Sequence, residues 1–147
     1  RRLTIVAATA PLEFVDANVI LRFLTRDDPE QGARAAGLFQ RLEEGTAHCL
    51  TCEGVIVEVV FVLSSRTLYH LPREEIRLKL LAIIDLPGLH LPTKQIYRRA
   101  LDLYVSLPRL DFVDALSVAN IEHARIETII SFDQDFDRVP SIHRREP

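Results

Sequence analysis

The 147-residue sequence is poor in cysteine and has no long apolar run. Its two cysteines, Cys49 and Cys52, form a single C-x-x-C pair, without a second pair or the paired histidines of a zinc finger. A structural zinc site needs four ligands, so we exclude one. We expect both cysteines to be small buried apolar side chains, with a thioredoxin-like redox pair as the alternative. No window approaches 18 uninterrupted apolar residues, so no membrane span is predicted.

Lysine is also scarce, with only Lys79 and Lys94 against sixteen arginines. Receiver domains of response regulators need a lysine near the last strand of their sheet, so this class is disfavoured. The net charge of −3 argues against a general nucleic-acid coat protein. It does not exclude a nuclease, because catalytic acids contribute to the deficit. Arginine suits bidentate contact with phosphate, although coding composition can produce the same bias.

The remaining composition is that of an ordinary globular chain. Hydrophobic residues make up 48% of the sequence and charged residues 27%, which fits one folded domain with a real core. Residues 1–11 combine a basic start with small residues, a weak signal-peptide pattern. We expect them to be an extension outside the fold and residues 12–147 to form a single domain.

Short apolar runs alternate with longer amphipathic stretches along the chain. Strands are expected at residues 12–15, 47–50, 88–91 and 127–131, with an edge strand at 141–143. Helices are expected at residues 18–25, from Asp28 to Gly45, at 72–86, after Thr93 as cap, and at 111–123. Residues 55–63 are ambiguous, being β-branched like a strand but long enough for a buried helix. The alternation predicts an α/β fold with a mainly parallel sheet covered by helices on both faces.

Four acidic residues stand beside or inside apolar runs: Asp16, Glu58, Asp114 and Asp133. A charge among aliphatic side chains is costly to bury unless it finds a partner, a metal or a proton. Asp16 and Asp133 both follow predicted strands. The functional site of a parallel α/β sheet lies beyond the carboxyl ends of its strands. These positions predict one acidic, metal-binding pocket.

Each acid also has a structural interpretation. Asp16 could cap the next helix, and Glu58 could lie in a buried salt bridge with Arg22 or Arg66. Asp111 and Asp114 lie three residues apart, on one side of a helix. We expect Asp111 to cap that helix and Asp114 to be the ligand.

The acids at odd positions from Asp133 to Asp137 resemble the start of a calcium loop. An EF-hand needs glycine and glutamate where Arg138 and Arg144 stand, so we exclude that site. Asp135 and Asp137 are therefore interpreted as solvated turn residues. Carboxylates without cysteine or histidine ligands suit Mg²⁺ or Mn²⁺ rather than zinc. A metal held in this way can activate water for cleavage of a phosphodiester.

Four segments together resemble the PIN-domain family, and most of all the VapC-type toxins of bacterial toxin–antitoxin pairs. They are residues 15–20 (VDANVI), 57–60 (VEVV), 111–116 (DFVDAL) and 131–136 (SFDQDF), in family order and with family-like spacing. The resemblance implies a three-layer α/β/α fold with a central, mainly parallel five-stranded sheet, and a helix at residues 55–63. It implies a Mg²⁺- or Mn²⁺-dependent endoribonuclease. By correspondence, the metal-binding acids are Asp16, Glu58, Asp114 and Asp133, and the supporting polar groups are Asn18 and Ser131.

The resemblance further implies a co-encoded antitoxin, a homodimer and a cytoplasmic protein that acts on RNA. Arg22, Arg26 and Arg66 would be candidates for contact with RNA phosphates. One alternative is a PIN nuclease that processes RNA without being a toxin. Another is an acidic metal-binding or phosphoryl-transfer α/β domain without nuclease activity. The phosphatases of the haloacid-dehalogenase type are disfavoured because Asn18 stands where their second aspartate is needed.

Overall fold

The structure is a computed structural model that describes residues 11–147. Most of the expected extension, residues 1–10, lies outside the described residues. The elements in chain order are β1 (Glu13–Phe14), α1 (Ala17–Thr25), α2 (Pro29–Glu44), β2 (Cys49–Leu50), α3 (Glu53–Ser64), α4 (Arg73–Ile84), β3 (Leu89–His90), α5 (Lys94–Ser106), α6 (Phe112–His123), β4 (Thr128–Ile130), the 3₁₀ helix η1 (Gln134–Arg138) and β5 (His143–Arg145).

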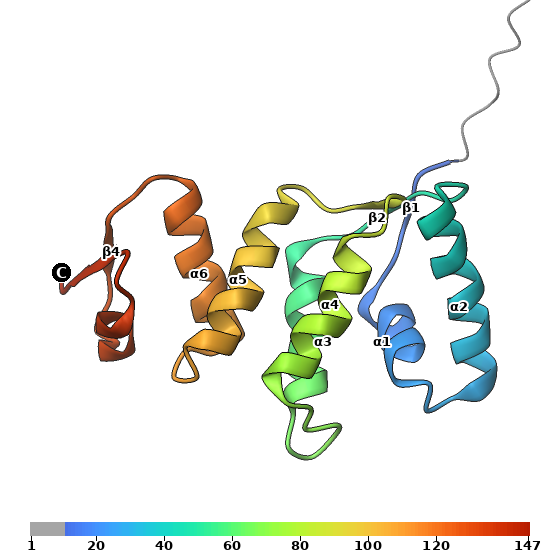
Figure 1. Ribbon diagram of the computed structural model, residues 1–147, viewed down its shortest axis with the longest axis horizontal. Helices are drawn as coiled ribbons and strands as arrows, with labels where there is room; N and C mark the ends of the chain where they lie inside the picture. The colour runs from blue at the N-terminus through green and yellow to red at the C-terminus, as the bar shows by residue number, and fades with distance from the viewer. Residues whose placement is uncertain (1–10) are drawn as a thin grey trace, which may run out of the picture.

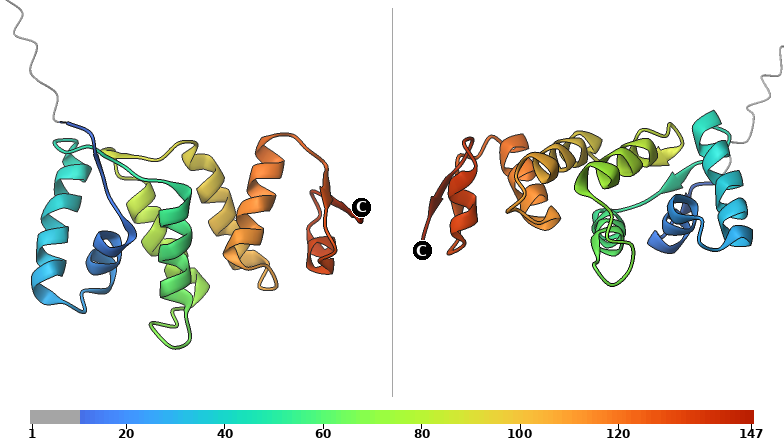
Figure 2. Two further views of the ribbon diagram at one scale, coloured as in Figure 1. Left: turned by 180° about the vertical axis from the view of Figure 1, so that it is seen from behind. Right: turned by 60° about the horizontal axis from the view of Figure 1, so that its bottom comes forward.

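These elements form an elongated molecule (Figure 1). Helices α1 and α2 lie at one end with β1 and β2, α3 and α4 occupy the middle, and α5 and α6 follow. The segment from β4 to the C-terminus forms the other end, and the views in Figure 2 agree on this order. Within residues 11–147, no helix combines the length and apolarity needed to cross a bilayer.

Local sequence signals explain several helix boundaries. Asp28 caps α2 by accepting a hydrogen bond from the Gln31 amide at 2.9 Å, and Gly45 ends the helix with φ of +75°. The ambiguous run at residues 55–63 is helical, as part of α3. The predicted cap of α5 is wrong, because Thr93 adopts a left-handed backbone with φ of +57° and makes no capping side-chain hydrogen bond.

The hydrophobic core joins side chains of all six helices to Val15, which follows β1, to Cys49 of β2 and to Leu89 of β3. Ile20, Leu42, Ile56, Leu80 and Leu101 are among its fully buried side chains. They come from helices far apart in the sequence, so the core depends on tertiary packing rather than on any single element.

The strands are parallel, and they form two sheets rather than one. One sheet has the order β1-β2-β3, in which Glu13 lies opposite Cys49 and Cys49 opposite Leu89. The other consists of β4 and β5, with Ile129 opposite Arg144. The α/β class with parallel strands is thus confirmed, but the prediction of one five-stranded sheet is wrong. Strand pairing is non-local, and strand propensity at each segment does not fix which edges meet.

A clasp between α4 and α5 holds the middle of the molecule together. The Arg73 guanidinium lies 4.0 Å from the centre of the Tyr104 ring and donates hydrogen bonds to the Tyr104 and Leu110 carbonyls at 2.7 and 2.5 Å. Arg77 adds an ion pair with Asp102 at 3.3 Å. These contacts fix the α5–α6 hairpin on α4, and with it the position of β4 and β5 at the far end.

Candidate metal centre

Asp16 occupies the carboxyl end of β1, as predicted. The buried Val15 fixes the end of the strand, and the exposed Asp16 then caps α1, where its Oδ1 accepts a hydrogen bond from the Asn18 amide at 2.5 Å. The cap uses one carboxylate oxygen. The other has no hydrogen bond within the described part of the chain and is available as a ligand.

Glu58 is exposed, although its apolar flanks predicted burial. Helical periodicity explains the difference, because Ile56, Val59 and Val60 turn into the core while Glu58 and Phe61 share the opposite side. Phe61 is 70% exposed. No ion pair to Glu58 exists among residues 11–147, so the alternative interpretation, a buried salt bridge to Arg22 or Arg66, does not hold for the part described. This side of α3 is apolar, acidic and uncovered.

Asp114 lies half-buried in the first turn of α6. Asp111 caps the helix, its Oδ1 accepting a hydrogen bond from the Asp114 amide at 2.8 Å. Burial raises the pKa of the Asp114 carboxyl, and the neighbouring charges of Asp111 and Asp133 raise it further. The charges of Asp111 and Asp133 are therefore close enough to destabilise the charged form of Asp114, which a divalent cation would relieve.

Asp133 follows β4 and heads η1. Its backbone amide donates a hydrogen bond to Ser131 Oγ at 3.0 Å, and its Oδ1 accepts one from the Asp135 amide at 2.9 Å. The side chain is exposed. The Ser131 hydroxyl thus supports the Asp133 turn, and the Asp133 charge acts on Asp114.

The four acids fall into two groups. Asp114 and Asp133 belong to the α6–β4 end, where their charges interact, whereas Asp16 and Glu58 belong to α1 and α3; helix α3 packs against both α1 and α6. No group of three or more histidine, cysteine, aspartate or glutamate side chains within residues 11–147 is arranged to hold a metal ion. The donor chemistry suits a hard cation such as Mg²⁺. One chain in this conformation does not assemble the predicted four-acid pocket.

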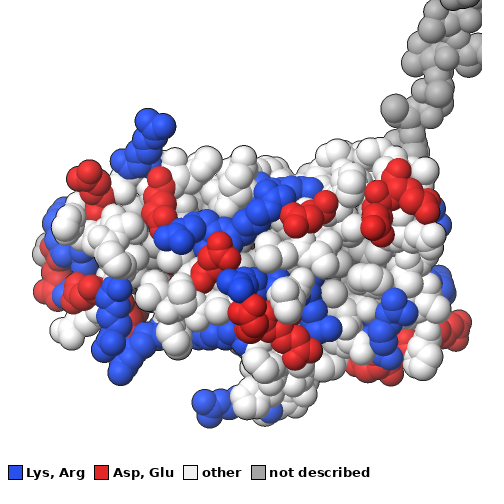
Figure 3. All heavy atoms as spheres, viewed as in Figure 1, with Lys and Arg blue, Asp and Glu red and all other residues white. Residues whose placement is uncertain are grey.

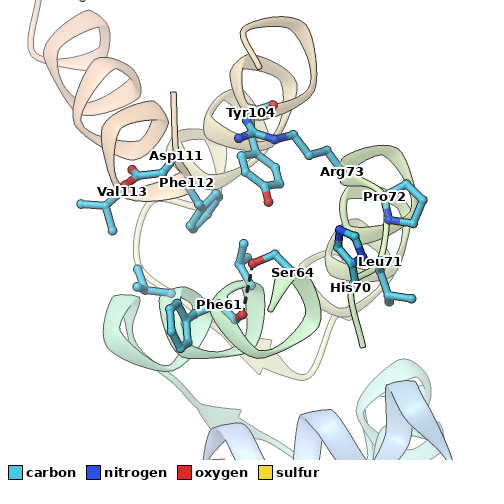
Figure 4. Close-up of a pocket in the computed structure, with 12 residues that line it drawn as sticks. Phe61, Ser64, His70, Leu71, Pro72, Arg73, Tyr104, Asp111, Phe112 and Val113 are labelled. Carbon is cyan, nitrogen blue, oxygen red and sulfur yellow. Dashed lines mark hydrogen bonds between the residues drawn. The ribbon is translucent and has the colours of Figure 1, made fainter. Parts of the chain in front are cut away.

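An open groove of about 470 Å³ lies between the helices of the two groups. In Figure 4, Phe61 and Ser64 from α3 face Asp111, Phe112 and Val113 across it. The sequence did not indicate this groove, because it depends on how α3 and α6 pack. Its exposed aromatic and aliphatic walls continue the uncovered side of α3.

The candidate RNA-binding arginines differ in their contacts. Arg22 donates hydrogen bonds to Gln31 at 2.7 Å and to Asp27 at 3.2 Å, and Arg26 lies over the Phe23 ring at 5.0 Å. Both side chains therefore stabilise local structure, while Arg66 is exposed. Basic and acidic side chains are interspersed over the face in Figure 3.

The two cysteines are free thiols in different environments. Cys49 is buried in β2, and burial, followed by the charge of Glu13, raises the pKa of its thiol. A raised pKa keeps the thiol protonated and unreactive. Cys52 is exposed at the start of α3, so the expectation of burial is right for Cys49 and wrong for Cys52.

Comparison with known proteins identifies the family. Among solved structures, the crystal structure of the VapC20 toxin of Mycobacterium tuberculosis, described as a sarcin–ricin loop cleaving toxin, is similar over 90% of this chain and 97% of that chain, with 20% identity and a TM-score of 0.35. A comparison with curated proteins finds no match. The family model for the PIN domain matches residues 14–142, a span that includes all four predicted acids. The chain belongs to the PIN-domain family.

Proposed function

We propose that the protein is a metal-dependent endoribonuclease. Membership of the PIN family supports a nuclease in general. The observation that carries the metal dependence is the half-buried Asp114, whose pKa is raised by burial and by Asp111 and Asp133. Ionised carboxylates crowd together at such a site when a cation offsets their repulsion.

The proposed ligands of Mg²⁺ or Mn²⁺ are Asp16, Glu58, Asp114 and Asp133. Asn18 and Ser131 would support the first and last of these, and Asp111 would hold the start of α6. A divalent cation in such a site supplies activated water and neutralises charge that develops on the phosphate. We further propose that the protein is the toxin of a toxin–antitoxin pair and acts in the cytoplasm, and this part of the proposal rests on the sequence resemblance.

The test is cleavage of structured RNAs by the purified protein with Mg²⁺, with Mn²⁺ or with EDTA, with fragment ends read by sequencing. We expect Asp16→Asn and Asp114→Asn each to reduce cleavage by roughly 100-fold or more, at least the loss seen when groups supporting a ligand are removed. The Asp114→Asn fold should survive, because the substitution removes a charge that its surroundings disfavour.

Glu43→Gln provides the matched control, since Glu43 is an exposed acid on α2, outside the proposed site. It should cleave like the wild type. Full activity of both aspartate variants, or cleavage undiminished by EDTA, would contradict the proposal. Tight Mn²⁺ binding without any cleavage of RNA would favour a non-catalytic metal-binding module instead.

A further inference from the structure

Among residues 11–147, the two sheets have four outer strand edges, on β1, β3, β4 and β5, and the edges of β1 and β4 carry the most exposed apolar side chains. Strand β1 pairs with β2 on one side only, and β4 pairs only with β5 among the described strands. Parallel strands are normally buried on both faces, because helices cover them. An open edge of this kind is a template for pairing with another strand.

The side chains at both edges are apolar and exposed. On the β1 side, Leu12 is 58% exposed and Phe14 55%. On the β4 side, Ile126, Ile130 and Phe132 are 53%, 57% and 73% exposed. Such a concentration of exposed large apolar side chains at two strand edges marks surfaces that are normally covered.

The backbone groups at the two edges are complementary. In β1, the amides of Glu13 and Val15 donate to β2, at the His48 and Leu50 carbonyls, so the backbone of Phe14 points to the open side. In β4, the Glu127 carbonyl accepts from His143 and the Ser131 amide donates to Arg145, so Thr128 and Ile130 point away from β5. Both free edges present a donor and an acceptor with parallel-strand spacing.

Pairing these edges fixes a register. The Phe14 amide would donate to the Thr128 carbonyl, and the Ile130 amide to the Phe14 carbonyl, which sets Phe14 opposite Ile129. The same register continued by two residues sets Asp16 opposite Ser131, about 4.8 Å away across the strands. Asp133 then follows on the same face, so the pairing that closes the sheet also brings the separated acids together.

The same chain cannot make this pairing without dismantling its own contacts. Helices α3 to α6 lie between the β1 and β4 edges (Figures 1 and 2). Residues 124–127 connect α6 to β4, and four residues reach about 14 Å at most. Packed helices are already about 8–10 Å apart, so β4 could reach β1 only if α5 and α6 moved with it. That movement would break the Arg73 clasp.

We propose that a second copy of this chain supplies the missing strand, so that two chains exchange their β4–β5 segments around a twofold axis. Each copy offers its β1 and β4 edges, and one twofold arrangement closes these edges in both copies. The clasps in both chains stay intact. Each metal centre would then combine Asp16 and Glu58 of one copy with Asp114 and Asp133 of the other. This inference rests on the proposed function for the activity of that shared site.

A disulfide tests the exchange without reference to activity. In a Cys49→Ala, Cys52→Ser background, Phe14→Cys and Ile129→Cys in one chain should form a covalent dimer under mild oxidation, seen on a non-reducing gel. Replacing the second change by Leu78→Cys, at an exposed position on α4, gives the matched control and should leave the chain monomeric on the gel. A disulfide within one chain, or none in a protein folded by circular dichroism, overturns the exchange.

Mixed dimers test the shared site. Chains carrying Asp16→Asn and Asp114→Asn, each with a different tag, are co-expressed and isolated as heterodimers by two affinity steps. One of the two sites in such a dimer would hold all four native acids, so about half of the wild-type activity should return although each variant alone is inactive. An inactive heterodimer, or a monomeric wild type that cleaves RNA, overturns the proposal. A wild type without cleavage refutes the proposed function, while the disulfide still reports the exchange.

Discussion

At the residue scale, the neighbouring sequence predicted two helix caps correctly, but it did not predict which side chains are exposed. Asp28 and Asp111 cap their helices as predicted, because a cap depends on residues within three positions. Glu58 is exposed because burial depends on which face of a helix meets the core, and an apolar run in sequence does not state that. Thr93 fails as a cap for a related reason, since its backbone conformation follows from the chain path after β3.

One residue-scale contact makes stability depend on pH. The Tyr69 hydroxyl and Thr25 hydroxyl donate hydrogen bonds to Asp27 and lower the pKa of its carboxyl, with Tyr69 the larger cause. A lowered pKa in the folded state stabilises the fold above the ordinary carboxyl pKa, and this contribution disappears as the pH falls through the folded value.

We expect Tyr69→Phe to return the Asp27 pKa towards its ordinary value. The variant should be less stable than the wild type near pH 7, and the difference should shrink as the pH falls through the lowered pKa of Asp27, because the carboxyl is then protonated in both proteins. Urea midpoints across pH measure the gap, and a carboxyl titration by NMR locates the pKa. In an Asp27→Asn background, the difference in stability caused by Tyr69→Phe should no longer depend on pH. A difference of the same size in that background would mean that Tyr69 acts through packing and not through Asp27.

At the element scale, the sequence was informative about helices and less so about strands. Every predicted helix is present with ends within a few residues, because periodicity and caps act within one element. The first four predicted strands are present but shorter, and the last has the predicted length but lies at His143–Arg145 instead of residues 141–143. A two- or three-residue strand is defined by its partner, which the sequence does not name.

Gly88 is the glycine at which the backbone of other segments comes closest to the space that a side chain would occupy. A Cβ there would lie 2.2 Å from the Ala47 carbonyl oxygen, next to the amide that donates to Leu42 at 2.8 Å. Gly88→Ala should therefore destabilise the fold by about 1–3 kcal/mol, as overpacking does. Gly37→Ala is the matched control, because nothing lies within 4 Å of its Cβ in the middle of α2. It should stabilise by about 0.5–1 kcal/mol. Equal effects in thermal or urea unfolding would contradict this account.

At the scale of the whole molecule, the sequence did not predict the division into two sheets. It correctly predicted the α/β class and the acids at strand ends, since those depend on segment order. Which edges pair depends on contacts such as the Arg73 clasp, and Arg73 was indistinguishable in sequence from other surface arginines. Within residues 11–147 no three of the candidate ligands are grouped around one metal position, and the proposed exchange of β4–β5 would bring the four acids together.

Exchange between copies makes stability depend on concentration. Each tenfold dilution should lower the stability of the dimer by about 1.4 kcal/mol, which corresponds to a fall in Tm of roughly 2–4 °C.

Phe14→Lys, which places a charge on the β1 edge, should remove this dependence by giving a monomer. Leu78→Lys, at a similarly exposed apolar position on α4, should retain it. Scanning calorimetry over a hundredfold concentration range, with light scattering for mass, measures both; a wild-type Tm independent of concentration would contradict the prediction.

The open edge of β1 also has a consequence for biosynthesis. Glu13 and Phe14 leave the ribosome more than a hundred residues before β4. At about 5–20 residues per second, the edge waits roughly ten seconds for any β4 of its own chain. During that interval α4 and α5 can already be joined by Arg73. A neighbouring nascent chain on the same messenger is then the nearest source of a finished strand, so the density of ribosomes on the messenger would influence how much protein assembles and how much aggregates.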